Sequence, residues 1–598
     1  MPDRLPGVLT SLGRSLRLGY RAEPRMLAIG FASTVAAAVS DALLALALVG
    51  AVVSGDHRAL LIAALSLGVL VTGTWLLGMV SARVNLRLTD RAAVDIESHI
   101  ARLHTGVPTI AHHERLDHID RLTLLRDHAS TLSELYQMLF SEIGVVPRLL
   151  ITLGLLISVR PELGLLGLFA IPPVIVSSWR AGAERRTEEA AAHHERLARS
   201  LFLLGTTPEG AQEVRVAQVQ QLLVERSAQE RTARYRARMI SAAWVSAAYV
   251  LFGAALVAGV GLSAGGRNGA AHVVLLLTAG SHLSQYVSQT VRETHLFRTI
   301  WLDGSRRLAW LEDYEAAEAS TGTAPAPAVL RDGIALEDVT FSYTGTEREV
   351  LKDISVLLPA GSVVAIAGDN GAGKSSLVKL LCGFYQPTSG RITVDGADLR
   401  DIDSRAWRAR LTGTFQDFVK FEYALSESVG LGDVSRIEDE RAITAALTRA
   451  SAADVLAKLD HRLDTQLGAS WDGGVEPSHG QWQKIALARS FMALQPLVIL
   501  LDEPTSAFDA HVEQEIFDRY AAAAADGAEA GQVTVLVSHR FSTVRTADLI
   551  LVLDGSRIVE SGSHADLMTM NGLYAELFTL QASGYASRAA ADVRQAGG

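Results

Sequence analysis

The sequence predicts a membrane part made only of helices, followed by a separate α/β part. The chain has 598 residues, 49% of them hydrophobic and only 20% charged, which is too long for one ordinary domain and too apolar for a disordered chain. Long apolar stretches occur only before residue 319. After residue 332 the apolar runs shorten to the length of strands, and a glycine-rich loop lies among them. These observations predict at least two domains of different class.

The membrane part, residues 1–318, contains six stretches long and apolar enough to be spanning helices. A spanning helix needs roughly 20 largely apolar residues. The fourth and sixth stretches are the least hydrophobic. The six candidate spans are centred on residues 27–53, 60–80, 135–159, 163–176, 242–262 and 270–291.

The connections between the spans predict the orientation of the chain in the membrane. Three connections are short, whereas the two between them are long and charged, so the short ones lie on one side and the long ones on the other. Arginines precede the first span and recur in the long connections, which places both in the cytoplasm by the positive-inside rule. We therefore expect a multi-pass protein of the cytoplasmic membrane with cytoplasmic N- and C-termini. No cleavable signal peptide is expected at the N-terminus.

The long connections have the composition of helices. Residues 81–103, 180–204 and 219–238 contain few Gly or Pro and many Ala, Leu, Glu and Arg. We expect the spans to continue as helices well into the cytoplasm, where the turns near residues 106–112 and 205–214 interrupt them. A cytoplasmic domain could push on these two turns.

Two polar features lie within the predicted spans. Asp41 falls near the middle of the first span, where an ionisable group is costly, so it is either paired between helices or in contact with a substrate or proton. Polar side chains also recur at helical spacing in the sixth span, as interhelical hydrogen-bonding groups or as the wall of a translocation path. This stripe consists of Ser281, Gln285, Gln289 and Arg292.

Composition excludes several classes of function. The net charge of −10 and the lack of a basic cluster argue against a nucleic-acid partner. A single cysteine, Cys382, excludes an internal disulfide framework and a thiolate metal cluster. An intramembrane protease or redox enzyme also lacks support, because there is no His-Glu-x-x-His helix and no cysteine pair.

The soluble part begins after a linker. Residues 319–331 are rich in Ala, Thr and Pro, residues 332–583 have the pattern of an α/β domain, and residues 584–598 are expected to be a mobile tail. The strongest signal is a G-x-x-x-x-G-K-[ST] motif between a strand and a helix, which predicts a P-loop NTPase domain. Backbone amides of such a loop bind phosphate oxygens, the lysine adds a positive charge, and the hydroxyl after it ligates Mg²⁺. The motif and the serine that follows are Gly368, Asp369, Asn370, Gly371, Ala372, Gly373, Lys374, Ser375 and Ser376.

Two further strands end in polar residues. The run 497–501 ends in Asp502 and Glu503, which predicts a Mg²⁺ ligand in the first and a residue that orients or deprotonates the attacking water in the second. The run 533–537 ends in Ser538 and His539, so the imidazole of His539 could reach a γ-phosphate. Alone, such a histidine would more often be structural.

The order of these motifs resembles an ATP-binding cassette (ABC). Together with six preceding spans, the chain resembles an ABC half-transporter of the exporter fold from about residue 20 to 580. The positions that carry the resemblance are Tyr343, the phosphate loop, Gln416, the segment 477–481, Asp502, Glu503, Asp509 and His539.

The resemblance implies a role for each matching position. Tyr343 would stack on adenine, and Gln416 would contact Mg²⁺ and the γ-phosphate. In this family two nucleotide domains close head to tail, so the signature segment of one chain faces ATP bound to the other, and Asp509 would communicate across that interface. The turns near 106–112 and 205–214 would be the coupling helices that dock on the nucleotide domains.

The signature departs from the usual Leu-Ser-Gly-Gly-Gln of the family. Here it is Pro477-Ser478-His479-Gly480-Gln481. Ser478 can still cap a helix together with Gln481, whereas His479 adds bulk where the backbone approaches ATP. In heterodimeric relatives a degraded signature tends to occur in the subunit whose own Glu and His are intact, so the resemblance favours a heterodimer over a homodimer.

The expected function is ATP-driven transport across the membrane, most simply export, with ATP and Mg²⁺ as cofactors. The partners would be a second half-transporter, membrane lipid and a substrate that the sequence does not identify. An importer that shares the exporter fold is one alternative. A nucleotide-gated regulator or channel is another, although Glu503 and His539 weigh against it because a sensor does not need fast hydrolysis.

Overall fold

The computed structural model describes residues 5–53, 57–159, 161–190, 192–207, 210–263, 269–297, 301–319, 322–503, 531–538 and 540–581. The chain forms two compact units. One comprises Met1–Gly106 and Asp120–Ala317, and the other comprises Val107–Ile119 and Glu318–Gly598. The short segment Val107–Ile119, which the sequence analysis placed in the membrane part, thus belongs by its contacts to the C-terminal unit.

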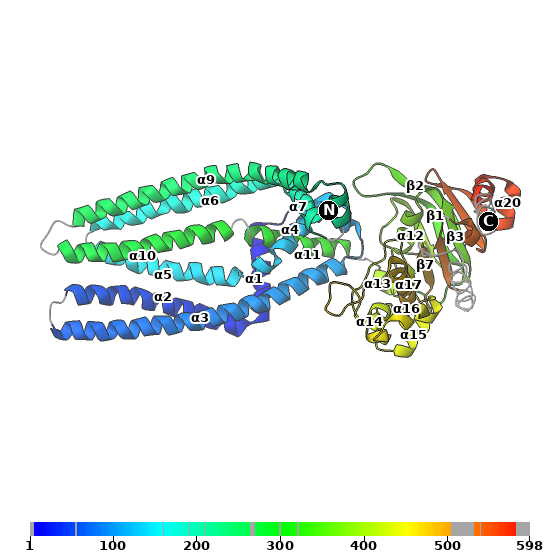
Figure 1. Cartoon of the computed structure of the whole chain (residues 1–598). Coiled ribbons are helices and arrows are strands. Elements are labelled where there is room, and N and C mark those ends of the chain that lie inside the picture. Colours follow the sequence, from blue (N-terminus) through cyan, green and yellow to red (C-terminus); the bar gives the residue numbers. More distant parts are fainter. Residues whose placement is uncertain are drawn as a thin grey trace. The chain divides into compact units, whose positions relative to one another are not determined.

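The N-terminal unit consists of helices (Figure 1). Its helices are α1 (Val8–Ala22), α2 (Pro24–Val53), α3 (His57–Gly106), α4 (Leu116–Leu132), α5 (Leu135–Val159), the short 3-10 helix η2 (Pro161–Leu165), α6 (Leu166–Ala190), α7 (Ala192–Thr206), α8 (Ala211–Val216), α9 (Gln220–Ser263), α10 (Gly269–Leu296) and α11 (Leu302–Glu318). The first turn of α4, up to Ile119, and the last residue of α11, Glu318, belong to the C-terminal unit.

The helices extend beyond what a bilayer requires, as the sequence analysis predicted. Helix α3 has 50 residues and α9 has 44. At 1.5 Å per residue α3 spans about 75 Å, compared with roughly 30 Å for a hydrocarbon core. Helix α3 ends at Gly106, the predicted interruption, and the 3-10 helix η1 (Ala111–His113) follows.

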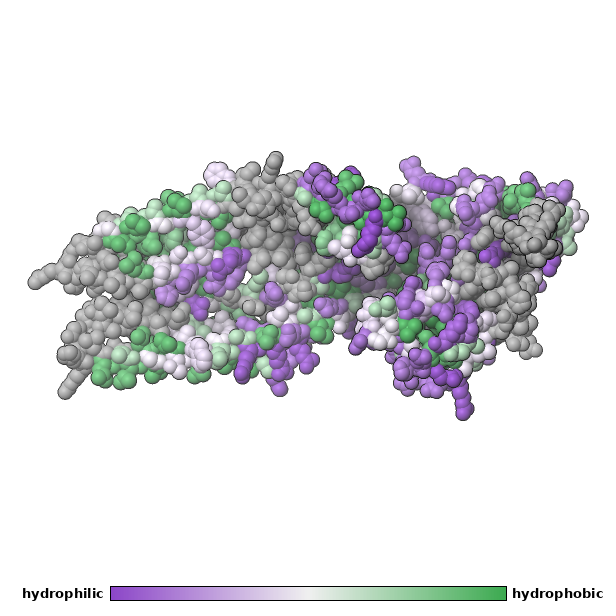
Figure 2. Space-filling model, viewed as in Figure 1, coloured by the Kyte–Doolittle hydropathy of each residue, from purple (hydrophilic) through white to green (hydrophobic). Residues whose placement is uncertain are grey.

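All six predicted spans lie on long helices, namely α2, α3, α5, α6, α9 and α10. Within the described residues, the stretches Ala64–Gly106 and Ala243–Gly261 are long and apolar enough to cross a membrane, and Pro24–Ser40, Pro161–Ser177 and Leu197–Thr206 are shorter apolar helices. Helix α3 exposes a row of large apolar side chains, including Leu61, Val69 and Trp75, each more than 60% exposed. Figure 2 shows hydrophobic surface at lower left, where α3 runs in Figure 1, and hydrophilic surface further along towards the middle of the view. Such a surface suits lipid rather than water.

Apolar packing holds the long helices together. Helix α2 packs against α3 and α5, and α6 packs against α9 and α10. One buried cluster joins α5, α6, α9 and α10 through Leu156, Leu166, Phe252, Leu283 and Val287. Lipid tails are as apolar as the surfaces of these helices, so the hydrophobic effect does not favour one helix pairing over another. Close packing of side chains therefore determines which helices associate.

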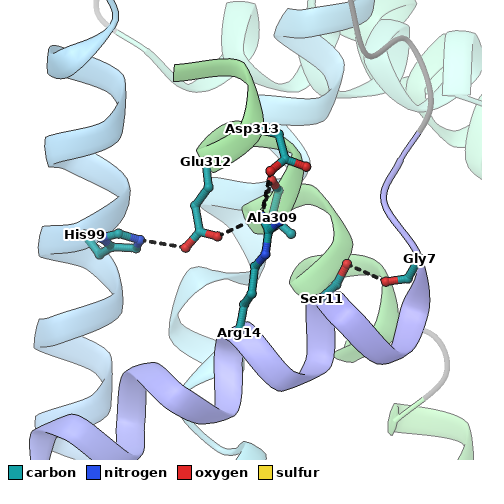
Figure 3. A network of polar contacts seen from close by, with 7 residues as sticks. All are labelled: Gly7, Ser11, Arg14, His99, Ala309, Glu312 and Asp313. Atoms are coloured by element: carbon teal, nitrogen blue, oxygen red, sulfur yellow. Dashed lines mark hydrogen bonds and ion pairs between the residues drawn. The ribbon is translucent and has the colours of Figure 1, made fainter. Parts of the chain in front are cut away.

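Helix α1 is attached to α11 by a polar network (Figure 3). Arg14 donates to Asp313 at 2.7 Å and to Glu312 at 3.3 Å, and His99 of α3 lies 3.0 Å from the other oxygen of Glu312. Burial alone would raise the pKa of Glu312, but the hydrogen bonds with His99 and Arg14 outweigh it and lower that pKa. The network joins α1, α3 and α11 at one point of the N-terminal unit.

The C-terminal unit is an α/β domain with two sheets (Figure 1). The strands are β1 (Gly333–Ser342), β2 (Glu349–Pro359), β3 (Val363–Gly368), β4 (Ser389–Val394), β5 (Ala397–Asp398), β6 (Leu411–Thr414), β7 (Val498–Asp502), β8 (Val533–Val537), β9 (Leu549–Asp554) and β10 (Arg557–Gly562). Its α-helices are α12 (Lys374–Leu381), α13 (Ser404–Arg408), α14 (Leu425–Gly430), α15 (Glu440–Arg449), α16 (Ala453–Lys458), α17 (His479–Ser490), α19 (Phe541–Val544) and α20 (His564–Met570), and the short 3-10 helices are η4 (Val434–Arg436) and η5 (Arg462–Asp464).

The larger sheet positions the site. Its strand order is β10-β9-β3-β8-β7-β6, with β3, β6, β7, β8 and β9 parallel to their neighbours and β10 antiparallel at the edge. The central strands β7 and β8 are buried along their whole length, as expected for continuous apolar runs. Because parallel strands end at the same edge, the C-terminal ends of β3, β6, β7 and β8 lie together there.

The smaller sheet, β2-β1-β4-β5, packs on the same core. That core contains Leu351, Leu377, Trp407 and Val535, and Cys382, which directly follows α12, is buried in it. Burial raises the pKa of the Cys382 thiol to about 12. The thiol is therefore an apolar packing group rather than a reactive one.

Candidate nucleotide site

The phosphate loop connects β3 to α12 through three glycines with left-handed backbone. Gly368, Gly371 and Gly373 have φ angles of 145°, 84° and 102°. A Cβ at Gly368 would lie 2.2 Å from the carbonyl oxygen of Leu553, and one at Gly373 would lie 2.7 Å from that of Val350. Gly368 and Gly373 therefore require glycine, and the loop leads directly into the N-terminus of α12, the arrangement that the motif predicted.

Lys374, the first residue of α12, is folded back over the loop. Its ammonium donates to the carbonyl oxygens of Gly368 at 2.8 Å and Asp369 at 3.0 Å, and the residue is only 7% exposed. Burial lowers the pKa of Lys374, although the nearby carboxylates of Glu503, Asp369 and Asp502 oppose this shift. A buried cation next to exposed loop amides is suited to a phosphate chain.

Asp502 ends β7, and burial raises its pKa, with a further increase from the charges of Glu503 and Asp417. The hydroxyl of Ser375 is near enough to the carboxylate to oppose this rise in the pKa of Asp502. The Oδ1 atom of Asp502 is buried without a hydrogen-bond partner among the described residues. A carboxylate oxygen and a hydroxyl in this arrangement fit the oxygen ligands that Mg²⁺ prefers.

Glu503 lies at a strained turn directly after β7. Its φ is 48°, and its backbone amide donates to the carbonyl oxygen of Val537 at 3.0 Å. A non-glycine residue in this region costs of order 1–3 kcal/mol and is typical of functional sites. The carboxylate of Glu503 is near enough to Lys374 and Asp502 for its charge to favour a higher pKa in both groups.

Gln416 follows β6 at the same edge. Thr414 of β6 pairs with Leu501 of β7, and Gln416 lies two residues further on as an exposed side chain. Asp417 is near enough to raise the pKa of Asp502, which places this loop beside the predicted metal ligand. His539 and Asp509 lie outside the described residues, although β8, which precedes His539, pairs with β7 up to Asp502.

Tyr343, the residue expected to stack on adenine, follows β1 and is half-buried. Its hydroxyl lies 2.9 Å from the Ser376 hydroxyl of α12, and its ring meets those of Phe341 and Tyr385 edge to face, with centroids 4.9 and 5.4 Å away. Ser376, which the sequence analysis assigned to the phosphate site, is buried and bonded to Tyr343. These contacts fix the tyrosine ring to the helix that begins at the phosphate loop.

The signature segment forms the capping box that its sequence predicted. Ser478 is the N-cap of α17, its hydroxyl accepts from the amide of Gln481 at 3.3 Å, and the Gln481 side chain accepts from the amide of Ser478 at 2.8 Å. His479 begins the helix and is exposed, and Gly480 is half-buried. The replaced leucine and glycine therefore leave the helix start intact.

Comparisons with known proteins agree with this geometry. The family model described as "ABC transporter" matches residues 351–506. An "ATM1-type heavy metal exporter" of Novosphingobium aromaticivorans is 38% identical over 46% of this chain and 43% of that protein, and an "ATP-dependent lipid A-core flippase" of Thiobacillus denitrificans is 38% identical over 45% and 44%. The chain thus spans less than half the length of these relatives. A solved "bacterial Atm1-family ABC exporter with ATP bound" superposes with a TM-score of 0.68 and 27% identity over 95% of this chain and 98% of that one.

The C-terminal part of this chain contains an ABC transporter domain, and the chain has the fold of an ABC exporter. Both the helical unit and the cassette are covered by the structural match. The match to the ABC transporter domain implies that this domain binds ATP.

The segment Val107–Ile119 makes side-chain contacts that the sequence analysis missed. Glu114 accepts from Lys379 at 2.8 Å and from the hydroxyl of Tyr385, and Arg408 donates to the carbonyl oxygen of Pro108. Ile110 and Ala111 pack against the core of the α/β domain. The sequence signal was the Gly106-Val107-Pro108 break, which located the segment but not its contacts.

The polar residues that the sequence analysis placed within the predicted spans lie on helices α10 and α2. Ser281, Gln285 and Arg292 are exposed on α10, and Gln289 is half-buried and donates to Glu293 at 2.9 Å. Asp41 lies on α2, but its side chain is outside the described residues. The spacing of the stripe along the helix is thus as expected, and its role in a translocation path stays a prediction.

Proposed function

We propose that this ABC transporter couples hydrolysis of MgATP to export of a substrate across the cytoplasmic membrane. The observation that carries the proposal is the convergence of Lys374, Asp502 and Glu503 at one edge of the larger sheet, on a chain that follows an ABC exporter over 95% of its length. A pure nucleotide sensor needs the first two groups but not a carboxylate placed to activate water.

Each residue has a distinct part in the proposed reaction. Lys374 holds the β- and γ-phosphates, and Ser375 and Asp502 hold Mg²⁺, which when bound neutralises charge on the phosphate oxygens. Glu503 orients or deprotonates the attacking water, and Gln416 reports the γ-phosphate to the rest of the chain. His539 assists at the γ-phosphate.

ATP binding would drive two cassettes together and switch the membrane helices between inward and outward opening. The signature Ser478, His479, Gly480 and Gln481 would face the ATP of the partner chain, with Asp509 at the same interface. The contacts of Val107–Ile119 with the α/β domain support its role as a coupling segment, and residues 205–214 would be the second one.

The partner is a second half-transporter. We infer a heterodimer rather than a homodimer, because the altered signature would face a partner site while Glu503 serves the chain's own site. The relatives are a heavy metal exporter, a lipid A-core flippase and, at 35% identity over 41% of this chain, a subtilin transport protein of Bacillus subtilis. They support export but differ in substrate, so we assign none here. The cytoplasmic placement of both termini follows from the arginine distribution.

Mg-dependent ATP hydrolysis by the chain purified in lipid tests the proposal, with particle mass measured on the same sample. Lys374→Ala should abolish ATP binding, and Glu503→Gln should bind ATP but lose turnover and accumulate a closed dimer. Normal turnover by Glu503→Gln would exclude its assigned role. ATP hydrolysis by a homodimer of this chain would exclude an obligatory heterodimer. If the chain by itself binds ATP but does not hydrolyse it, the result supports a heterodimer.

A further inference from the structure

Two side chains that contact Tyr343 are both held by Glu114 of the segment Val107–Ile119. Lys379 places its ammonium 5.4 Å from the centre of the Tyr343 ring, within cation–π range, and Tyr385 meets that ring edge to face at 87°. One carboxylate oxygen of Glu114 accepts from Lys379 and the other accepts from the Tyr385 hydroxyl. The carboxylate of Glu114 thus binds two of the side chains that contact the Tyr343 ring.

The chemistry of this cluster ties the ring to a fixed orientation. Burial alone would lower the pKa of Lys379, but the hydrogen bond to Glu114 and the contacts with Tyr343 raise it, so the side chain stays a cation. Lys379 also belongs to α12, the helix that begins with Lys374 at the phosphate loop. The base site and the phosphate site therefore share one rigid helix.

The segment that carries Glu114 is anchored independently of this carboxylate. Ile110 and Ala111 pack on the domain core, and Arg408 holds the carbonyl oxygen of Pro108. A neutral replacement of Glu114 should consequently leave the segment docked while releasing Lys379 and Tyr385.

We propose that Glu114 is a positioning residue for Tyr343, so that nucleotide base binding and the contact of Val107–Ile119 with Lys379 and Tyr385 stabilise each other. The inference rests on the proposed function, because it takes the base to lie on Tyr343. Coupling between two binding events is reciprocal. If base binding strengthens the Glu114 contacts by some factor, loss of those contacts must weaken base binding by the same factor.

The experiment compares two probes, ATP and tripolyphosphate, which shares the phosphates but lacks the base. In the full chain, Glu114→Gln should weaken ATP binding by about two- to fivefold, the range of a partly exposed ion pair, and leave tripolyphosphate binding unchanged. Lys379→Gln should act in the same way, and Lys379→Arg should restore affinity because the cation is kept. Tyr385→Phe, which removes only a hydroxyl, should have a smaller effect of the same kind.

Glu337→Gln is the matched control. Glu337 forms an ion pair with Arg391 at 2.7 Å in the same unit and is 43% exposed, similar to the 38% of Glu114. This variant should change neither affinity. If Glu114→Gln weakens both probes equally, its effect is on general folding, and if it weakens neither, Glu114 does not position the base site; either result overturns the proposal.

Hydrogen exchange supplies the reciprocal measurement. ATP should slow exchange in residues 107–119 more than tripolyphosphate does in the wild-type chain, and this difference should disappear in Glu114→Gln. Equal protection by both probes in the wild type would contradict the inference. The proposed function fails separately, if Lys374→Ala leaves ATP binding unchanged or if Glu503→Gln keeps normal turnover.

Discussion

The imidazole of His479 lies against the ring of Phe418, with centroids 5.5 Å apart and planes inclined by 36°. His479 is the first residue of α17, and Phe418 lies two residues after Gln416. Neither His479 nor Gly480 is among the described residues with left-handed backbone. The histidine therefore occupies a helical position that does not require glycine, and it packs on its own domain.

This arrangement predicts that the altered signature is structurally competent. His479→Gly should preserve the capping box and change ATP hydrolysis by no more than about twofold, whereas Ser478→Ala should destabilise the helix start by about 1 kcal/mol. Thermal unfolding and steady-state hydrolysis measure the two effects. A large gain in hydrolysis by His479→Gly would show instead that the histidine obstructs the partner's ATP.

Tyr343 provides a second prediction. Tyr343→Ala should weaken ATP affinity by about 1–3 kcal/mol if its ring stacks on the base, and Tyr343→Phe should keep most of the affinity because only the hydrogen bond to Ser376 is lost. Equilibrium titration with ATP tests both variants. Unchanged affinity in Tyr343→Ala would locate the base contact elsewhere.

Asp502 predicts opposite effects on stability and activity. Its folded pKa is raised by burial, so the folded state disfavours the ionised carboxylate, and that cost is present at neutral pH and disappears as pH falls below its ordinary value of 3.8. Asp502→Asn should therefore raise the melting temperature at pH 7 and abolish Mg-dependent hydrolysis. A lower melting temperature would mean that the ionised carboxylate stabilises the fold.

The same carboxyl group should set the acid limit of hydrolysis. Because Mg²⁺ and the proton compete for Asp502, increasing the Mg²⁺ concentration should move the acid limb of the pH–rate profile to lower pH. Binding of ATP without Mg²⁺ should lack this limb and serves as the control. If the acid limb of the pH–rate profile does not move with the Mg²⁺ concentration, the limb reports the titration of a group other than Asp502.

Asp395 predicts a stability effect of the opposite sign. Its Oδ1 atom accepts from the amides of Arg331, Asp332 and Gly333 at 2.9–3.1 Å. Burial alone would raise the pKa of Asp395, but these backbone hydrogen bonds lower it below its ordinary value of 3.8. Its stabilisation is complete above that value and is lost as pH falls through the lower folded pKa.

Asp395→Asn should consequently destabilise the domain by about 1 kcal/mol, comparable to the loss of an exposed helix cap. The difference from wild type should be equal at pH 7 and pH 5 when unfolding is followed by denaturant titration. If the difference in unfolding free energy between the variant and the wild type is already smaller at pH 5 than at pH 7, the pKa of Asp395 is not lowered.

Much of the nucleotide site was predictable because its signals are local. The glycines of the phosphate loop, the two carboxylates at the end of β7 and the Ser478–Gln481 capping box each lie within a few residues of sequence, and backbone geometry determines them. The length of the helices was also predictable, because the composition of the residues in α3 and α9 favours helix throughout.

The missed contacts are long-range. Glu114 and Lys379 are 265 residues apart, and the sequence contains no period or motif that pairs them. The same is true of Phe418 and His479, and of the assignment of Val107–Ile119 to the C-terminal unit. Such pairings arise when the two segments pack, so they follow from tertiary structure rather than from local preference. His539, Asp509 and the tail predicted for residues 584–598 lie outside the described residues.

The burial of Cys382 has a practical consequence for following motion in this chain. It is the only cysteine of the 598 residues, and with a thiol pKa of about 12 it stays protonated and shielded at neutral pH. Thiol-directed fluorophores or spin labels should therefore ignore the native chain and mark only cysteines introduced by design. Paired labels on the segment Val107–Ile119 and on α15 can then record distances during turnover, with the native core left unaltered.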